Sequence, residues 1–308
     1  MKDLGIVVPI VTPCARTGEP DLDGFRAVCQ YVLSEGCHSI FVGGSSGRGP
    51  WFSRDDQARV CRAAADFIDA DVPLLAGCMA TGLTDMVENA GAMADAGAQI
   101  AVVTAPGYFH YNQSEIETIL MKFADASPLP VMVYDIPVFA KVKLDWEMVQ
   151  RLARHGNIIG FKDSTADFSR FKSPIRLLDE IPDFQLLQGK ERFLVDSLLA
   201  GAKGFVVSMV QVDVRPYVAL YEATRSGDLE LARQLQAKIR QAMDLFDQMF
   251  EGRSESSIFF HFLNWSLRHR QICDNILLAH EGDCPPWIAD VGEQTVEIYD
   301  RAVSMIPM

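Results

Sequence analysis

Residues 130–162 read PVMVYDIPVFAKVKLDWEMVQRLARHGNIIGFK, and the unit that they predict decides the fold. One apolar run ends in Tyr134, a second one, NIIGF at 157–161, ends in Lys162, and an amphipathic stretch over 146–154 separates them. Runs that are apolar throughout are typical of strands buried on both faces, as in a parallel sheet. The segment therefore predicts a strand, a helix and a second strand, with a phenol and an amine at the two strand ends.

The same alternation continues along most of the chain. We predict strands over 6–11, 39–42, 73–76, 99–104, 130–134, 157–162, 184–188 and 204–207, and helices over 22–35, 54–70, 85–96, 114–126, 146–154, 169–180 and 191–200. Eight such units match a (β/α)8 TIM barrel, an α/β fold. A doubly wound sheet also alternates, but it usually carries a glycine fingerprint after its first strand, and VTPC at 11–14 is not one.

The last part of the chain reads as helices alone. The clearest of these cover 229–250, 257–270 and 294–305. No linker rich in Pro, Gly or Ser separates them from the alternating part. We therefore expect a barrel over 1–225 and a C-terminal helical extension over 226–308 that packs on the barrel.

Composition narrows the class of protein. Of the 308 residues 49% are apolar, and no apolar run approaches the ~20 residues that a bilayer span needs. The amino terminus lacks the long apolar core of a signal peptide, so we expect a soluble cytoplasmic protein that binds no membrane. A net charge of −13 argues against a general nucleic-acid binder. Scattered cysteines without a C-x-x-C pair and histidines without a metal motif predict reduced thiols and no metal site.

Lys162 carries the strongest chemical prediction. Desolvation at the mouth of a buried strand can lower the pKa of an amine toward neutrality. A neutral amine can attack a ketone and form a Schiff base. Tyr134 ends the preceding strand, and the chemistry of a barrel collects at the carboxyl ends of its strands. Each residue alone could instead lie on the barrel rim, as a snorkelling lysine or a tyrosine with a satisfied hydroxyl.

Other loops after predicted strands open on the same face. GGSSG at 43–47 can hold a carboxylate through backbone N–H groups and two hydroxyls, although an ordinary glycine turn is the simpler interpretation. Tyr108 lies in an aromatic loop after the fourth strand, Gly189 follows the seventh and Ser208 follows the eighth. A barrel would bring all of these residues to one face, and chance is a poor explanation of such a grouping. We therefore predict a site on this face.

The motifs, taken in order, resemble those of a known enzyme family. GSSG at 44–47, Pro106 with Tyr108, YDIP at 134–137, GFKD at 160–163 and QG at 188–189 resemble the dihydrodipicolinate synthase/N-acetylneuraminate lyase family. The resemblance extends over essentially the whole chain, including the helical tail. It implies a (β/α)8 class I aldolase or a relative, without a cofactor, that forms a Schiff base with pyruvate or another 2-oxo acid. It also implies a homotetramer built as a dimer of dimers.

The resemblance implies roles for individual residues. Lys162 corresponds to the Schiff-base lysine and Tyr134 to the phenol that relays protons. Ser45 and Ser46 stand where the family binds the 2-oxo acid carboxylate, with nearby backbone N–H groups. Tyr108 corresponds to a tyrosine that completes a proton relay across a dimer interface in the synthases. The remaining predicted substrate-binding residues are Gly47, Arg48, Gly189, Glu191, Arg192, Val206 and Ser208.

Three positions depart from the family pattern. Arg48 replaces a common glutamate, Phe139 replaces an arginine of the synthases, and Arg192 replaces an acid of the sialic acid lyases. Because an apolar ring cannot replace a bidentate cation, dihydrodipicolinate synthase activity is disfavoured. Arg48 and Arg192 predict selectivity for substrates with a second anionic group. The alternative for each is that it pairs with a nearby carboxylate.

The sequence as a whole favours a lyase. We expect a Schiff-base-forming enzyme that cleaves or forms a C–C bond of a 2-oxo acid to give pyruvate and an aldehyde; N-acetylneuraminate is not the favoured substrate. Three alternatives remain open. They are a dehydratase of 2-oxo-3-deoxy sugar acids, a dihydrodipicolinate synthase and a 2-oxo acid binding protein without turnover.

Overall fold

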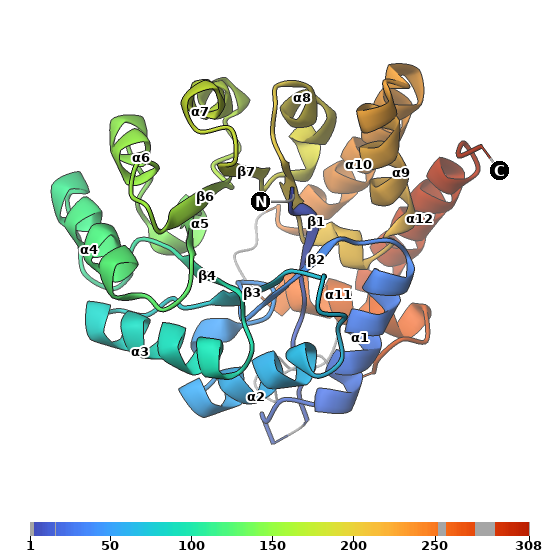
Figure 1. The fold of residues 1–308 in the computed structure, drawn as a ribbon. Coiled ribbons are helices and arrows are strands. Elements are labelled where there is room, and N and C mark those ends of the chain that lie inside the picture. Colours follow the sequence, from blue (N-terminus) through green and yellow to red (C-terminus); the bar gives the residue numbers. More distant parts are fainter. Residues whose placement is uncertain (1–2, 16, 252–256, 275–286, 308) are drawn as a thin grey trace.

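Eight parallel strands form a closed barrel in the order of the sequence (Figure 1). The structure, a computed structural model, describes residues 3–15, 17–251, 257–274 and 287–307. The strands are β1 (Gly5–Pro9), β2 (Ser39–Val42), β3 (Leu74–Gly77), β4 (Ile100–Val103), β5 (Val131–Asp135), β6 (Ile158–Asp163), β7 (Gln185–Gln188) and β8 (Gly204–Val206). The prediction of a TIM barrel is confirmed.

Helices surround the barrel and follow the predicted order. They are α1 (Leu22–Ser34), α2 (Arg54–Ala65), α3 (Leu83–Asp95), α4 (Gln113–Ala126), α5 (Pro137–Ala140), α6 (Trp146–Leu152), α7 (Phe168–Glu180), α8 (Leu194–Leu199) and α9 (Arg215–Ser226), with short 3-10 turns η1 (Gly49–Trp51), η2 (Glu191–Phe193) and η3 (Met209–Gln211). The four-residue α5 was not predicted. The helix predicted over 191–200 was wrong at its start, because those residues form the tighter turn η2 before α8.

Side chains of the strands fill two separate layers of core. Val7, Phe41, Leu75 and Met132 belong to a cluster inside the barrel. Val8 and its counterparts on the other strands point outward and pack against the helices. Successive side chains of a strand alternate between these two layers, and both layers are buried. This is why the strand segments are apolar throughout.

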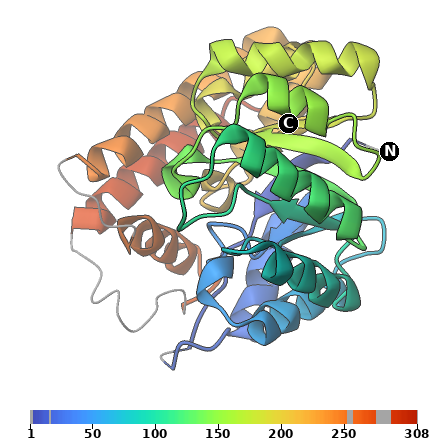
Figure 2. The ribbon, with the colours of Figure 1, turned by 90° about the vertical axis from the view of Figure 1, so that its left-hand side faces the viewer.

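Within its described residues, the end of the chain forms the helices α10 (Leu229–Met249), α11 (Ser257–His269) and α12 (Trp287–Val303), which lie on one side of the barrel (Figure 2). α10 packs against both α9 and α12, and α11 also packs against α12. The buried hydroxyls of Tyr217 and Tyr299 lie 2.9 Å apart and join α9 to α12. None of the described helices is long and apolar enough to cross a bilayer. The boundary between barrel and extension at 225/226 stays a prediction.

The last helix begins earlier than the predicted 294. Gly292 lies within it and lowers the helical signal of this segment. A Cβ at this glycine would lie 2.2 Å from the ring of Trp265 on α11. The glycine is therefore required by the close approach of two helices, which the sequence pattern alone does not reveal.

Candidate active site

Tyr134 and Lys162 lie side by side at the carboxyl ends of β5 and β6. They are register partners in the parallel pairing of the two strands. The ammonium nitrogen of Lys162 lies 3.8 Å from the ring centroid of Tyr134 and 5.5 Å from that of Phe41. Both Lys162 and Tyr134 are buried. The structure thus brings together the amine and the phenol that the sequence singled out.

The surroundings of Lys162 favour its neutral form. Burial lowers the pKa of the amine from its ordinary value to about 7. The carboxylate of Glu191 opposes this effect and raises the pKa, whereas the charge of Lys190 lowers it further. At this pKa a large fraction of the amine is unprotonated near neutral pH, which nucleophilic attack on a carbonyl carbon requires.

Tyr134 is held as a neutral phenol. Burial raises its pKa well above the ordinary range, and hydrogen bonds with the hydroxyls of Ser164 and Ser45 oppose this shift only in part. A protonated phenol in contact with two hydroxyls can donate a proton and receive one in return. Ser164 was not among the predicted site residues. Its position two residues after Lys162 is the signal that could have found it.

The turn after β2 places two hydroxyls at the site. Ser45 contacts Tyr134, and the hydroxyl of Ser46 lies 2.7 Å from that of Ser208, which follows β8. Gly49 must be a glycine, because a Cβ there would lie 2.0 Å from the carbonyl oxygen of Gly43. The predicted hydroxyl pair therefore sits on a tightly packed turn that faces the end of β8.

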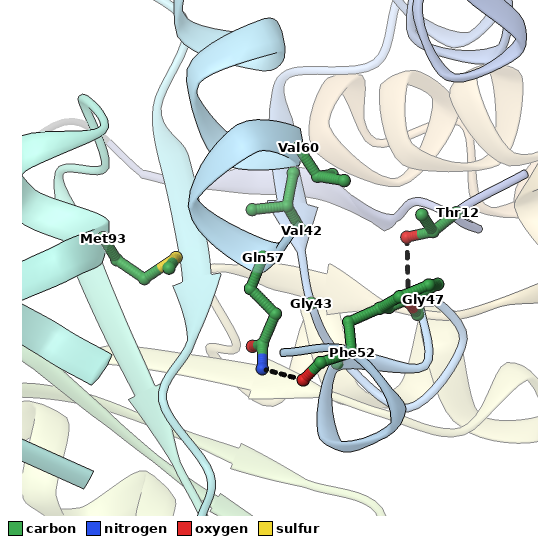
Figure 3. Close-up of a pocket in the computed structure, with 9 residues that line it drawn as sticks. Thr12, Val42, Gly43, Gly47, Phe52, Gln57, Val60 and Met93 are labelled. Atoms are coloured by element: carbon green, nitrogen blue, oxygen red, sulfur yellow. Dashed lines mark hydrogen bonds between the residues drawn. The ribbon is translucent and has the colours of Figure 1, made fainter. Parts of the chain in front are cut away.

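A small cavity beside this turn is lined by residues of the turn and by side chains of β2, α2 and α3 (Figure 3). Thr12 donates a hydrogen bond of 2.8 Å to the carbonyl of Gly47, and the amide of Gln57 donates one of 3.1 Å to the carbonyl of Phe52 (Figure 3). The other lining residues are Val42, Gly43, Gly49, Val60 and Met93. The first bond holds the turn from the segment after β1, and the second holds its end from α2. The cavity lining includes neither Lys162 nor Tyr134.

The loops after β7 and β8 complete the mouth. Glu191 is buried, and one of its carboxylate oxygens accepts hydrogen bonds from the backbone N–H groups of Ser208 (3.2 Å) and Met209 (3.3 Å). A Cβ at Gly189 would lie 2.0 Å from the hydroxyl oxygen of Ser164, so a side chain does not fit there. Val206 lies in the core inside the barrel.

The two predicted selectivity arginines contact the C-terminal helices. Arg192 binds Asp244 at 2.8 Å and Asp247 at 2.6 Å, both on α10. The guanidinium carbon of Arg48 lies 3.8 Å from the ring centroid of Phe260 on α11, and Arg48 is buried. For Arg192 these contacts match the alternative of pairing with carboxylates.

Tyr108 is not brought to Tyr134 within one chain. Its side chain is 89% exposed, and its backbone is left-handed, with φ of 78°. The ring contacts Phe109, at 5.0 Å between centroids. Phe139 on α5 is also exposed. These aromatic side chains lie on the segments that follow β4 and β5, at the same end of the barrel as Lys162.

Comparison with known proteins agrees with this geometry. The dihydrodipicolinate synthetase family matches residues 2–265. The chain belongs to this family. A 4-hydroxy-tetrahydrodipicolinate synthase of Methanoculleus marisnigri is 30% identical over 243 residues, which are 78% of this chain and 82% of the relative. One from Coxiella burnetii is 26% identical over 246 residues, 80% of this chain and 82% of the relative.

Solved structures of dihydrodipicolinate synthetase family proteins share the fold. YagE of E. coli K12, in complex with pyruvate, has a TM-score of 0.87 at 25% identity and covers 96% of this chain and 98% of its own. A dihydrodipicolinate synthase of Bacteroides thetaiotaomicron has a TM-score of 0.85 at 27% identity. The match covers 95% of this chain and 97% of that synthase. As a member of this family the chain is an enzyme, a lyase of the carbon–carbon aldolase type.

Proposed function

We propose that this enzyme is an aldolase of a 2-oxo acid. It cleaves a C–C bond of the 2-oxo acid to give pyruvate and an aldehyde, or it forms that bond from these two compounds. The observation that carries the proposal is the buried amine of Lys162, with a pKa of about 7, against the ring of Tyr134. Membership of the family supports it. The YagE structure, solved with pyruvate, belongs to a protein of similar fold.

The reaction begins at Lys162. Its neutral amine attacks the C2 carbonyl of the 2-oxo acid, and loss of water gives an iminium. In the cleavage direction the C4 hydroxyl gives up its proton, the C3–C4 bond breaks, and its electron pair forms an enamine as the aldehyde leaves. The enamine then takes a proton at C3, and water releases pyruvate and restores the amine. Tyr134, in contact with Ser45 and Ser164, is placed to move these protons.

Binding of the substrate is assigned to the surrounding loops. The hydroxyls of Ser45 and Ser46 and the N–H groups of their turn bind the carboxylate next to C2. The aldehyde half then extends toward Gly189, Glu191 and Ser208, whose loops are joined by hydrogen bonds of the Glu191 carboxylate.

No group of three or more histidine, cysteine or carboxylate side chains in the described part of the chain could hold a metal ion. The proposed reaction needs none.

Dihydrodipicolinate synthase activity is the second candidate, because curated relatives carry that name. Phe139 disfavours this activity, because its exposed apolar ring occupies the position at which the synthases have an arginine. A dehydratase would use the same lysine and phenol, but would remove a C3 proton and expel the C4 hydroxyl.

One experiment separates these reactions. The enzyme is incubated with a panel of monoanionic and dianionic 4-hydroxy-2-oxo acids, and the products are identified by mass. Release of pyruvate with an aldehyde supports the proposal. A product that keeps all carbons and loses one water indicates a dehydratase. In a parallel incubation with pyruvate, consumption of pyruvate only when the co-substrate of the synthases is also present indicates a synthase. The dehydratase result overturns the proposal, and the synthase result replaces the favoured cleavage reaction with the second candidate.

A further inference from the structure

Two buried carboxylates directly follow the reactive residues on β5 and β6. Asp135 follows Tyr134 and Asp163 follows Lys162, and the two aspartates are register partners. Because side chains alternate along a strand, they point away from the barrel interior. Their side chains are only 1% and 4% exposed. Two like charges at adjacent buried positions repel each other unless a cation compensates them.

Arg170 supplies this cation from the first turns of α7. Its guanidinium donates a hydrogen bond of 2.8 Å to Asp135, and the same nitrogen lies 4.0 Å from Asp163. It also donates to the carbonyl of Leu144, whose own N–H donates to Asp135 at 3.3 Å. One side chain thus ties together the ends of β5 and β6 and the segment that leads into α6.

The backbone of Arg170 is itself fixed. Asp167 caps α7 and accepts a hydrogen bond of 3.1 Å from the N–H of Arg170. Asp163 accepts one of 2.7 Å from the N–H of Thr165, and the N–H of Ser164 donates to the carbonyl of Asp135 at 2.9 Å. The backbone of Arg170 is therefore fixed by the loop that begins at the reactive lysine.

The pairing of β5 with β6 is irregular just before the site. The register shifts between Val131 and Met132, so that Gly160 rather than Ile159 pairs with Met132. Such a bulge re-aims the residues that follow it and locally disrupts the ladder. The separation of the strand ends then depends more on side-chain contacts. The bridge by Arg170 lies one residue beyond Tyr134 and Lys162.

We propose that Arg170 is a positioning residue, which holds Tyr134 in register with Lys162 by bridging Asp135 and Asp163. The inference rests on the proposed function only in that the two residues must act together on one substrate. Burial raises the pKa of Asp135 to about 6, with Asp163 acting in the same direction and Arg170 against it. Without the guanidinium, the two adjacent carboxylates would repel each other and separate the strand ends, unless Asp135 took up a proton.

The test compares Arg170→Met and Arg170→Lys with Arg176→Met, an exposed arginine on the same helix. We expect Arg170→Met to lower kcat by about 10–10²-fold with KM within about 2-fold, because small misplacements of reacting groups have effects of this size. Arg170→Lys should recover part of the loss. Adding Asp163→Asn to Arg170→Met should also recover part of it, because one of the repelling charges is removed.

A purely structural role gives a different result. In that case Arg170→Met lowers Tm, kcat per folded enzyme stays at the wild-type value, and Asp163→Asn restores nothing; this result overturns the proposal. If Arg170→Met does not fold, Arg170→Lys and Asp135→Asn, which weaken the bridge from either side, are measured instead. A lower kcat per folded enzyme at unchanged KM supports the proposal, and a kcat at the wild-type value overturns it.

Amide hydrogen exchange tests the bridge by Arg170 without a need for turnover, so the bridge and the proposed function can fail separately. If the wild-type enzyme turns over no 2-oxo acid, the proposed function fails. Faster exchange at Ser164 and Thr165 in Arg170→Met than in Arg176→Met then still supports the bridge. Equal exchange in the two variants contradicts it.

Discussion

The burial that makes the amine of Lys162 reactive also lowers the free energy of unfolding. Its pKa of about 7 in the folded chain lies below that of an unfolded lysine, so the unfolded state binds more protons between these two values. Stability therefore rises with pH in this window as the unfolded lysine loses its proton. We expect Lys162→Met to stabilise the fold by on the order of 3 kcal/mol at pH 8 and by less near pH 10.

Urea unfolding at pH 8 and pH 10 measures this effect. Lys122→Met, at an exposed position of α4, is the control and should change stability little at either pH. Equal stability of Lys162→Met and the wild type at pH 8 would show that burial of Lys162 costs nothing.

Tyr134 should act in proton transfer more than in binding. Tyr134→Phe keeps the ring that lies against Lys162 but removes the hydroxyl that contacts Ser45 and Ser164. We expect kcat to fall by about 10²–10⁴-fold, the range for a positioned acid–base group, with KM little changed. Steady-state kinetics on the substrate found in the panel test this. Activity near the wild-type level removes Tyr134 from the relay.

Position along the strands explains which site residues the sequence could predict. Lys162 and Tyr134 end apolar runs, and Ser46 and Ser208 follow other runs, so a barrel brings them to one face. Partners distant in sequence could not be predicted. Arg192 pairs with residues 52 and 55 positions away on α10, which no local pattern connects to it.

At the scale of elements, the tight turn after β2 shapes the proposed binding site of the substrate carboxylate. A Cβ at Gly49 would overlap the backbone of Gly43, whereas one at Gly91, inside α3, meets nothing within 4 Å. We expect Gly49→Ala to destabilise the protein by roughly 1–3 kcal/mol, as overpacking does, and to raise KM for the 2-oxo acid. The same substitution at Gly91 should stabilise the protein by about 0.5–1 kcal/mol, because alanine favours a helix.

Chemical denaturation and steady-state kinetics check both glycine variants. If Gly49→Ala keeps both the stability and KM of the wild type, the turn does not hold the carboxylate.

The secondary-structure elements were predicted well where they are long and periodic. Short pieces such as α5 and η2 were not, because three or four residues carry no periodic signal.

At the scale of the whole molecule, exposed aromatic side chains gather at the mouth of the barrel. Trp51, Tyr108, Phe109 and Phe139 lie on the segments after β2, β4 and β5, and each is at least 56% exposed. Tyr108 and Phe109, whose ring centroids are 5.0 Å apart, form an exposed apolar pair among them, and larger exposed apolar patches mark interfaces between proteins. We propose a homotetramer built from dimers, in which Tyr108 reaches the site of a neighbouring chain.

Sedimentation equilibrium at micromolar concentration tests the assembly. We expect a tetramer, and a smaller species for Phe109→Glu, because a charge would be buried in the interface. A solved structure of similar fold is described as a monomeric dihydrodipicolinate synthase variant, so the fold itself does not require assembly. A wild-type monomer would contradict the proposal and remove any role of Tyr108 in a neighbouring site.

Trapping of the Schiff base tests the central claim most directly. The enzyme is incubated with pyruvate and borohydride, digested, and mapped by mass spectrometry, with Lys162→Met as the control. The reduced pyruvate adduct is expected on the peptide that contains Lys162, and none is expected in the control. An adduct on Lys190 or Lys203, or no adduct in the wild-type enzyme, would contradict the account.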